Sequence, residues 1–256
     1  MEKIVIEKLS LSYSDGTEAL RNISLRIPDK SITVLFGPAG GGKSTLLRVI
    51  NRLNDLADVE HIEGKVLLKN LDESYIDLLN PKLDVISLRR RVGMVFARPT
   101  VLPMSIQENL TYGLSVKGVK DETILREAVE RSLDQAALWE EVKDRLDEPA
   151  VALSGGQQQR LCLARSLVLE PEVILLDEPT SGLDPLSTDK VEASLQDLKQ
   201  NYTIVLVPHS VQQAARTADQ SAFFLQGELV EYAEGKSLFT NPKDERSQDY
   251  VEGRFG

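Results

Sequence analysis

The chain has 256 residues, of which 41% are hydrophobic, which is enough to bury one substantial core and excludes general disorder. Forty acidic residues against thirty basic ones give a net charge of −10, and no basic block stands out, so no nucleic-acid partner is expected. The single cysteine, Cys162, is expected to be buried, and no apolar run approaches the roughly 20 residues of a membrane-spanning helix.

Alternating and apolar stretches predict β-strands through the first part of the chain. Strands are expected at 4–9, 23–27, 31–36, 65–68 and 92–96. The segment 31–36 is richer in apolar residues than the two before it, as is typical of a central strand. It runs into a glycine-rich stretch and then into a predicted helix from residue 43 to about 53.

A block of helical periodicity follows from about residue 98 to 168. In its segment 121–137, one helix face is expected to carry Ile124, Leu125, Ala128, Val129, Ser132 and Leu133. Alternation then resumes, with strands expected at 173–176, 203–207, 221–225 and 228–230. One helix is expected at 186–199, and a second follows the strand at 203–207 and ends at about residue 218. This order predicts an α/β fold with parallel strand pairing, interrupted by an inserted helical subdomain.

The glycine-rich stretch fits the pattern G-x-x-x-x-G-K-[ST], after an apolar strand and at the start of a helix. Glycines let successive backbone N–H groups point into one concavity, and the helix N-terminus adds positive partial charge. We expect Lys43 to bridge the β- and γ-phosphates of ATP and the Ser44 hydroxyl to ligate Mg²⁺. The predicted loop consists of Gly37, Pro38, Ala39, Gly40, Gly41, Gly42, Lys43, Ser44 and Thr45. The alternative is a turn that only resembles the motif.

Two acidic residues, Asp177 and Glu178, follow the strand predicted at 173–176. An acid at the carboxyl end of a parallel strand faces the ligand crevice of such a sheet. We expect Asp177 to hold Mg²⁺, directly or through water. Glu178 is expected to polarise the water that attacks the γ-phosphate, because in-line attack needs a base behind that phosphate. The alternative is a solvated acidic turn.

The pentapeptide Leu-Ser-Gly-Gly-Gln at 153–157 is the most specific feature of the chain. Ser154 and Gln157 have the spacing of a capping box and predict a helix start. Gly155 and Gly156 would be costly inside a helix, so we expect them to allow close approach and to leave N–H groups free to meet a phosphate. The alternative is an ordinary capped helix. The pentapeptide resembles the signature sequence of ABC ATPases.

This resemblance implies a P-loop NTPase core with a mainly parallel sheet, an N-terminal antiparallel β part and an inserted helical subdomain. The core lobe is expected at 1–97 and 166–256, and the helical subdomain at 98–165. The resemblance also implies a homodimer that sandwiches two ATP molecules. Each ATP would be held by the phosphate loop of one subunit and by residues 154–156 of the other.

Further positions take their expected roles from the same resemblance. Tyr13 resembles the aromatic residue that stacks on adenine, with a surface tyrosine on a strand as the alternative. The segment 181–184, which ends in Asp184, resembles the loop that contacts the opposite subunit. His209 resembles the histidine that hydrogen-bonds the γ-phosphate, whereas His61 is expected to be a solvated surface residue.

Several stretches resemble more narrowly the ATP-binding subunit of prokaryotic phosphate importers. They are residues 49–56, 102–106, 137–146, 160–162, 239–243 and 249–256. The resemblance implies integral membrane permease subunits as partners and, indirectly, a substrate-binding protein. The chain would then be peripheral at the cytoplasmic face of the membrane, docked on a protein that crosses it.

The chain departs from the family pattern at Ala97, at Pro208 and, at variable positions of the phosphate loop that we expect to be harmless, at Ala39 and Gly41. Ala97 stands where the family usually has a glutamine that contacts Mg²⁺ and the attacking water, so we expect slower hydrolysis or weaker coupling while ATP binding survives. Pro208 precedes His209 where threonine is common, and its fixed φ is expected to shift the histidine. The alternatives to a phosphate importer are the ATPase of another transporter, a slow-hydrolysing regulatory protein, and a non-transport ABC protein, against which the single cassette argues.

Overall fold

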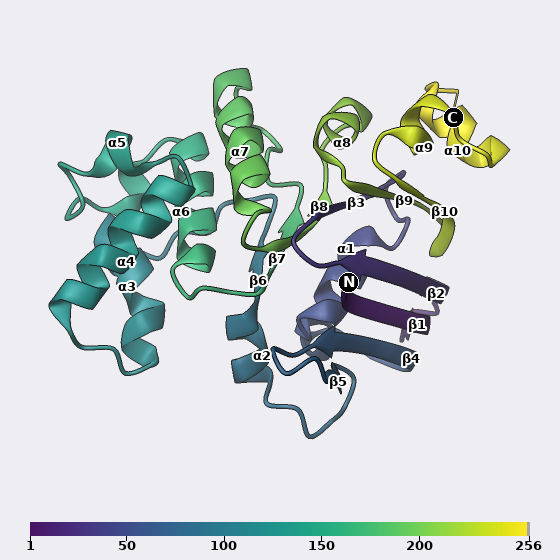
Figure 1. The fold of residues 1–256 in the computed structure, drawn as a ribbon, viewed down its shortest axis with the longest axis horizontal. Helices are drawn as coiled ribbons and strands as arrows, with labels where there is room; N and C mark the ends of the chain where they lie inside the picture. Colours follow the sequence, from purple (N-terminus) through teal and green to yellow (C-terminus); the bar gives the residue numbers. More distant parts are fainter. Residues whose placement is uncertain (255–256) are drawn as a thin grey trace.

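The computed structural model describes residues 1–254, which form two β-sheets with helices packed around them (Figure 1). The first sheet is antiparallel and has the strand order β2-β1-β4-β5. Its strands are β1 (Glu2–Tyr13), β2 (Glu18–Pro28), β4 (Val59–Lys69) and β5 (Tyr75–Asp77). The antiparallel N-terminal part expected from the sequence is therefore confirmed.

The second sheet has six strands in the order β10-β9-β3-β8-β7-β6. They are β3 (Ile32–Phe36), β6 (Val92–Val95), β7 (Val173–Asp177), β8 (Thr203–Val207), β9 (Gln220–Leu225) and β10 (Glu228–Glu234). Every neighbouring pair is parallel except β10 with β9. The predicted central strand is β3, and the carboxyl ends of β3, β7 and β8 meet at one edge, where such sheets bind ligands.

Alternating side chains of β3 enter two hydrophobic cores, one on each face of the second sheet. Ile32 and Val34 belong to the core that this sheet shares with the later helices, and Leu35 belongs to the core that it shares with the antiparallel sheet. Helix α1 (Lys43–Ile50) contacts β2, β7 and β8 and buries one apolar face in the second core. Both faces of the sheet are covered, which explains why β3 and β8 read as continuous apolar runs.

The predicted helical block is confirmed by four helices that gather beyond β6, on one side of the molecule (Figure 1). They are α3 (Ile106–Val116), α4 (Glu122–Gln135), α5 (Trp139–Val142) and α6 (Gly155–Leu167). A capping box at Ser105 begins α3, and the Asp121 carboxylate caps α4. The other helices are α2 (Val85–Arg91), α7 (Pro185–Leu198), α8 (Val211–Thr217), α9 (Ser237–Thr240) and α10 (Glu245–Val251).

Two details of the predicted helices were wrong. Helix α1 ends at Ile50 rather than near residue 53, because Arg52 adopts the left-handed region with φ +61° and a short 3₁₀ turn, Leu53–Leu56, follows. Ile124 is 53% exposed, so the packed face of α4 is narrower than expected and begins at Leu125. Leu125, in the same first turn, packs against the core, so the predicted face was one residue too wide at its start.

The segment resembling phosphate importers at 239–243 contains the end of α9, and the first part of 249–256 contains the end of α10. Phe255 and Gly256, the last two residues of that resemblance, lie outside the described residues. Phe239 and Tyr250 pack on Phe36, at the end of β3, with ring centroids 4.7 and 6.2 Å from its ring. The C-terminal helices therefore support the strand that leads into the glycine-rich loop.

Candidate functional site

The loop 37–42 joins β3 to α1 and has a backbone that requires glycine at two positions. Gly37 has φ +138°, and a Cβ added there would lie 2.0 Å from the carbonyl oxygen of Phe224. Gly42 has φ +95°, and an added Cβ would lie 2.4 Å from the carbonyl oxygen of Ala19. Side chains are excluded at both positions by the neighbouring backbone. The strand, loop and helix expected around the motif are present in that order.

Lys43 places its ammonium group inside this loop. Its Nζ donates to the carbonyl oxygens of Gly37 and Pro38, at 2.8 Å in each case. Burial lowers the pKa of Lys43, and the carboxylates of Glu178 and Asp177 partly offset that effect. Within residues 1–254, no side chain caps the N-terminus of α1 and no acidic residue lies in its first turn. A cation beside an uncapped helix N-terminus favours the binding of an anionic group.

A hydrogen bond between two predicted Mg²⁺ ligands joins the first turn of α1 to the end of β7. Ser44 Oγ donates to Asp177 Oδ1 at 2.8 Å. A hydroxyl and a carboxylate are the hard oxygen donors that Mg²⁺ prefers. No cluster of three metal-ligating side chains occurs among the described residues. Ser44 and Asp177 are enough protein ligands for Mg²⁺, which usually takes one or two of them together with phosphate oxygens and water.

Glu178 and His209 lie next to each other at the ends of β7 and β8. Glu178 Oε2 is 3.8 Å from His209 Nδ1, and both side chains are well exposed. Glu178 has φ +49°, an uncommon conformation for a residue with a side chain, and its N–H donates to the carbonyl oxygen of Val207 at 2.9 Å. Pro208 directly follows β8, so it removes no hydrogen bond from the sheet. The structure therefore brings the predicted base and the predicted histidine together.

Gln213, which the sequence did not single out, is 2% exposed and connects the loop after β7 to the loop after β8. Its Oε1 accepts a hydrogen bond from the backbone N–H of His209 at 2.8 Å. Its Nε2 donates to Thr180 Oγ1 at 3.0 Å, in the loop that follows Glu178. The pattern Ser-x-x-Gln at 210–213 signals only a helix start, which α8 provides, and gives no indication of this bridge.

Tyr13, the tip of the loop and His61 are the remaining positions considered from the sequence in this part of the chain. Tyr13 ends β1, and its hydroxyl oxygen is 3.2 Å from Thr45 Oγ1, so the ring borders the first turn of α1. Ala39 and Gly40 form the exposed tip of the loop, and Gly41 is buried. His61 is exposed and lies 3.5 Å from the Glu63 carboxylate, as expected of a solvated residue.

The pentapeptide forms the start of α6 with the predicted capping box. Ser154 Oγ accepts from the N–H of Gln157 at 3.3 Å, and Gln157 Oε1 accepts from the N–H of Ser154 at 3.0 Å. The two glycines differ. A Cβ added at Gly156 would lie 2.4 Å from Ser187 Oγ on α7, whereas one added at Gly155 would meet no atom of the described residues within 4 Å. Packing within the chain therefore explains only Gly156.

Asp184 caps α7 beside this helix start. Its carboxylate accepts from the N–H of Ser187 at 2.9 Å and from the Ser187 hydroxyl at 2.6 Å, and these bonds lower the pKa of Asp184. Asp184 and residues 154–157 thus form one group. No hydrogen bond or ion pair in the described part of the chain joins them to residues 37–45. The sequence-predicted residues accordingly fall into two groups within one chain.

Ala97 follows β6, and its loop is attached to α6. Gln159 Nε2 donates to the carbonyl oxygen of Phe96 at 2.9 Å. A groove of about 440 Å³ adjoins this loop and is lined in part by Phe96, Arg98 and Cys162. Cys162 is 8% exposed, as expected, and burial raises the pKa of its thiol. The methyl group of Ala97 offers no metal ligand and no hydrogen-bond donor or acceptor.

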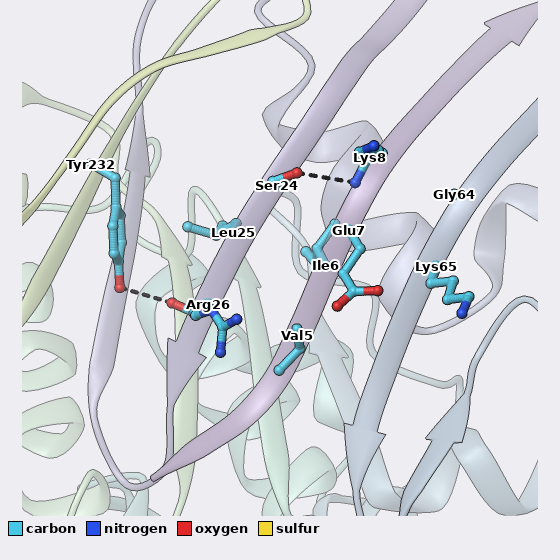
Figure 2. A pocket seen from close by; sticks show the side chains of 10 residues that line it. All are labelled: Val5, Ile6, Glu7, Lys8, Ser24, Leu25, Arg26, Gly64, Lys65 and Tyr232. Atoms are coloured by element: carbon cyan, nitrogen blue, oxygen red, sulfur yellow. Dashed lines mark hydrogen bonds between the residues drawn. The ribbon is translucent and has the colours of Figure 1, made fainter.

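A larger hollow, of about 720 Å³, lies elsewhere, on the outer face of the antiparallel sheet (Figure 2). Tyr232 of β10 forms one wall and is fixed by a hydrogen bond from its hydroxyl to the carbonyl oxygen of Arg26 at 2.8 Å. None of the sequence-predicted site residues lines this hollow. The candidate site is therefore identified by its charged and hydroxyl side chains around Lys43 and Asp177 and not by the volume of a cavity.

Comparison with known proteins gives related sequences across the whole chain. A family model described as ABC transporter matches residues 20–181. The chain is 54% identical to the phosphate import ATP-binding protein PstB of Idiomarina loihiensis, over 98% of this chain and 90% of that protein. It is 52% identical to the phosphate import ATP-binding protein PstB 2 of Ligilactobacillus salivarius, over the full length of both.

Solved structures give the same fold. The chain is similar to cbiO1 of Clostridium perfringens, part of the ABC transporter complex cbiONQ, with a TM-score of 0.79, 27% identity and coverage of 99% of this chain and 96% of that one. It is also similar to the ATP-binding cassette MJ0796, a dimeric structure of a post-hydrolysis state bound to ADP and Pi. That comparison has a TM-score of 0.77, 28% identity and coverage of 90% of this chain and 98% of the other.

Proposed function

This chain belongs to the ABC transporter family, and from that premise we propose that it is the ATP-hydrolysing subunit of an importer for inorganic phosphate. The observation that carries the ATPase assignment is the hydrogen bond from Ser44 to Asp177, beside Lys43 and Glu178. It joins the phosphate loop to the acidic pair at one edge of the sheet. Phosphate as the cargo rests on the relatives, which are phosphate import proteins by name.

We assign the roles in hydrolysis to the residues that meet at this edge. Lys43 and the loop amides bind the β- and γ-phosphates, and Tyr13 stacks on adenine. Ser44 and Asp177 would hold Mg²⁺, which neutralises charge on the phosphates when bound. Glu178 orients the attacking water and accepts its proton as the bond between the β,γ-bridging oxygen and the γ-phosphorus breaks, releasing ADP and phosphate. His209, beside Glu178, donates a hydrogen bond to the γ-phosphate.

Residues 154–157 and Asp184 are assigned to the nucleotide of a partner subunit in a homodimer. The open space at Gly155 supports this role, because no packing within the described residues accounts for that glycine. The solved structure of a related cassette is dimeric. ATP would hold the two subunits together, and hydrolysis would release them, which is a ligand-driven shift between open and closed pairs. The two parts of the chain, 98–165 and the remainder, would then move as units.

The membrane role follows from the importer assignment. No helix among residues 1–254 is long and apolar enough to cross a membrane. We propose that the chain docks on integral permease subunits at the cytoplasmic face. Those subunits would receive phosphate from a substrate-binding protein. The groove beside Phe96 and Arg98 adjoins the loop that carries Ala97, and we propose this loop as the contact with the permease subunit.

A second candidate function is a slow-hydrolysing regulatory protein, and Ala97 favours it. The methyl side chain removes one contact to Mg²⁺ and to the attacking water that the family pattern supplies. Turnover of the purified complex separates the two candidates, since phosphate uptake driven by ATP requires hydrolysis. Uptake of a different anion in place of phosphate would instead indicate another cargo.

The experiment that tests the ATPase assignment is the pair of variants Glu178→Gln and Lys43→Ala. With ATP and Mg²⁺, Glu178→Gln is expected to remain bound to ATP and to run as a stable dimer in size-exclusion chromatography, because the base is lost while both binding surfaces remain. Lys43→Ala should lose most nucleotide affinity by calorimetry. A Glu178→Gln protein that stays monomeric where the wild type dimerises would contradict the role of Glu178.

A further inference from the structure

Glu141, at the middle of α5, accepts hydrogen bonds from three side chains on two other helices. Gln157 Nε2 donates to Oε2 at 3.0 Å. Arg160 donates twice, from Nη1 to Oε1 at 2.8 Å and from Nη2 to Oε2 at 3.0 Å. Lys190 Nζ, on α7, donates to Oε1 at 2.6 Å. One carboxylate therefore connects α5, α6 and α7.

This connection is electrostatically strong because one of its partners is buried. Arg160 has a side chain that is only 3% exposed, and its Nη1 also donates to the carbonyl oxygen of Ala137 at 2.5 Å. Hydrogen bonds from Arg160, Lys190 and Gln157 lower the pKa of Glu141 to about 2. Glu141 is therefore ionised near neutral pH, and all three donors meet a charged carboxylate. Removing the carboxylate would leave a buried guanidinium without its counter-ion.

Two partners of Glu141 belong to the helices that form the predicted ATP-facing surface, Gln157 to the start of α6 and Lys190 to α7. Gln157 uses Oε1 to accept from the N–H of Ser154 and uses Nε2 to donate to Glu141. The orientation of its amide, and with it the capping box, is thus fixed by Glu141. Lys190 extends from α7, whose first turn contains Ser187 in close packing with Gly156. The starts of α6 and α7 are held together both by that packing and by the Glu141 carboxylate.

We propose that Glu141 is a positioning residue for ATP-driven pairing of two subunits. It holds the amides of residues 154–156 and the segment capped by Asp184 in one fixed arrangement, so that both meet the partner's nucleotide at the same time. Preorganised donors cost no reordering when the ligand arrives, and small displacements of such donors are expensive. This inference rests on the proposed function, because it requires ATP to lie between two subunits.

The test uses the Glu178→Gln protein as parent and measures two affinities separately. Binding of a fluorescent ATP analogue to the monomer reports the phosphate loop, and analytical ultracentrifugation with ATP and Mg²⁺ reports pairing. Adding Glu141→Gln is expected to weaken pairing about tenfold or more while changing monomer nucleotide affinity less than about twofold. Glu140→Gln is the matched control, because the adjacent Glu140 is exposed and, among residues 1–254, pairs only with Lys143.

A second variant keeps the proposal testable if Glu141→Gln does not fold. Lys190→Met removes only the link to α7 and leaves Arg160 paired with Glu141, and the Lys190 side chain is 38% exposed, so the fold should survive. It is expected to weaken pairing several-fold, with about the same melting temperature as the parent. Glu141→Asp, which retains the charge, should recover part of the pairing lost in Glu141→Gln.

The outcomes separate this proposal from the proposed function. If the parent fails to pair with ATP, the sandwich itself is wrong. If the parent pairs and the folded Glu141→Gln and Lys190→Met proteins pair equally tightly, Glu141 has no positioning role. A lowered melting temperature with unchanged pairing of the folded fraction would likewise overturn the proposal, because that is the result of a merely structural ion pair.

Discussion

Replacing each of the two adjacent glycines of the pentapeptide by alanine should have opposite effects on stability. At Gly155, an added Cβ meets nothing within 4 Å in the part of the chain that the structure describes, so the methyl group is accommodated without strain. At Gly156, the Cβ would lie 2.4 Å from Ser187 Oγ and 2.9 Å from Ser187 Cβ, which is closer than real contacts allow. Either α6 must move away from α7 or Ser187 must change its rotamer and lose its bond to Asp184.

The magnitudes follow from helix propensity and packing. Alanine is favoured over glycine in a helix by up to about 1 kcal/mol, so Gly155→Ala should leave the free energy of unfolding unchanged or raise it slightly. Overpacking typically costs about 1–3 kcal/mol, so Gly156→Ala should be destabilised by up to about 2 kcal/mol after the propensity gain. For a chain of this size, a change of 1 kcal/mol shifts Tm by roughly 2–4 °C.

In the alanine variants of the two glycines, ATP-driven pairing and ATPase activity should not follow the free energy of unfolding. A methyl group at residue 155 covers the open surface where the partner's phosphate is proposed to approach the backbone N–H groups. Gly155→Ala should therefore lose most ATP-driven pairing and ATPase activity although it is at least as stable as the wild type. Thermal unfolding by circular dichroism and ultracentrifugation with ATP and Mg²⁺ measure the two properties separately. Full pairing and turnover in Gly155→Ala would refute the claim that this glycine serves a ligand.

Three further predictions concern other parts of the site. Ala97→Gln should raise steady-state ATP turnover, because it restores a side chain able to contact Mg²⁺ and water. Equal rates for variant and wild type would show that Ala97 does not slow hydrolysis. Lys43→Ala should remain folded, since the loop backbone is set by its glycines, and should lose most ATP affinity in calorimetry. Unchanged affinity would contradict the assignment of Lys43 and the loop to the phosphates. Because the pKa of Glu141 is about 2 rather than its ordinary 4.5, its contribution to stability is complete above about pH 4.5 and is lost as the pH falls toward 2. Denaturant titrations of wild type and Glu141→Gln should converge over that range, and a constant difference would exclude the linkage.

The central strands of the second sheet could be predicted because they are buried on both faces. The apolar runs at β3, β7 and β8 and the alternation in β1 gave clear signals, and the pentapeptide carried its own capping box. The short strand β5 and the helix α2 were not predicted. Strand β5 spans only three residues and depends on pairing with β4. Helix α2 carries one fully buried side chain, Leu88, so its sequence has no apolar stripe.

The site was predictable where the chemistry is local in sequence and not where it is assembled by the fold. The glycine-rich loop and the acidic pair are contiguous motifs with a known mechanism. Arg160 and Lys190 lie 19 and 49 residues from Glu141, and only the packing of three helices brings them together. The bond between Ser44 and Asp177, 133 residues apart, could be expected only because parallel strands end at a common edge.

The buried amide of Gln213 has a consequence for how loss-of-function variants of this protein should be interpreted. Because it holds the backbone of His209 and the side chain of Thr180, the two loops that carry the base and the histidine cannot drift apart independently. A change such as Gln213→Leu would uncouple them without touching nucleotide, metal or partner. The variant would still bind ATP, but the Glu178 carboxylate and the His209 imidazole would seldom be in their catalytic positions at the same time, so hydrolysis would be slow.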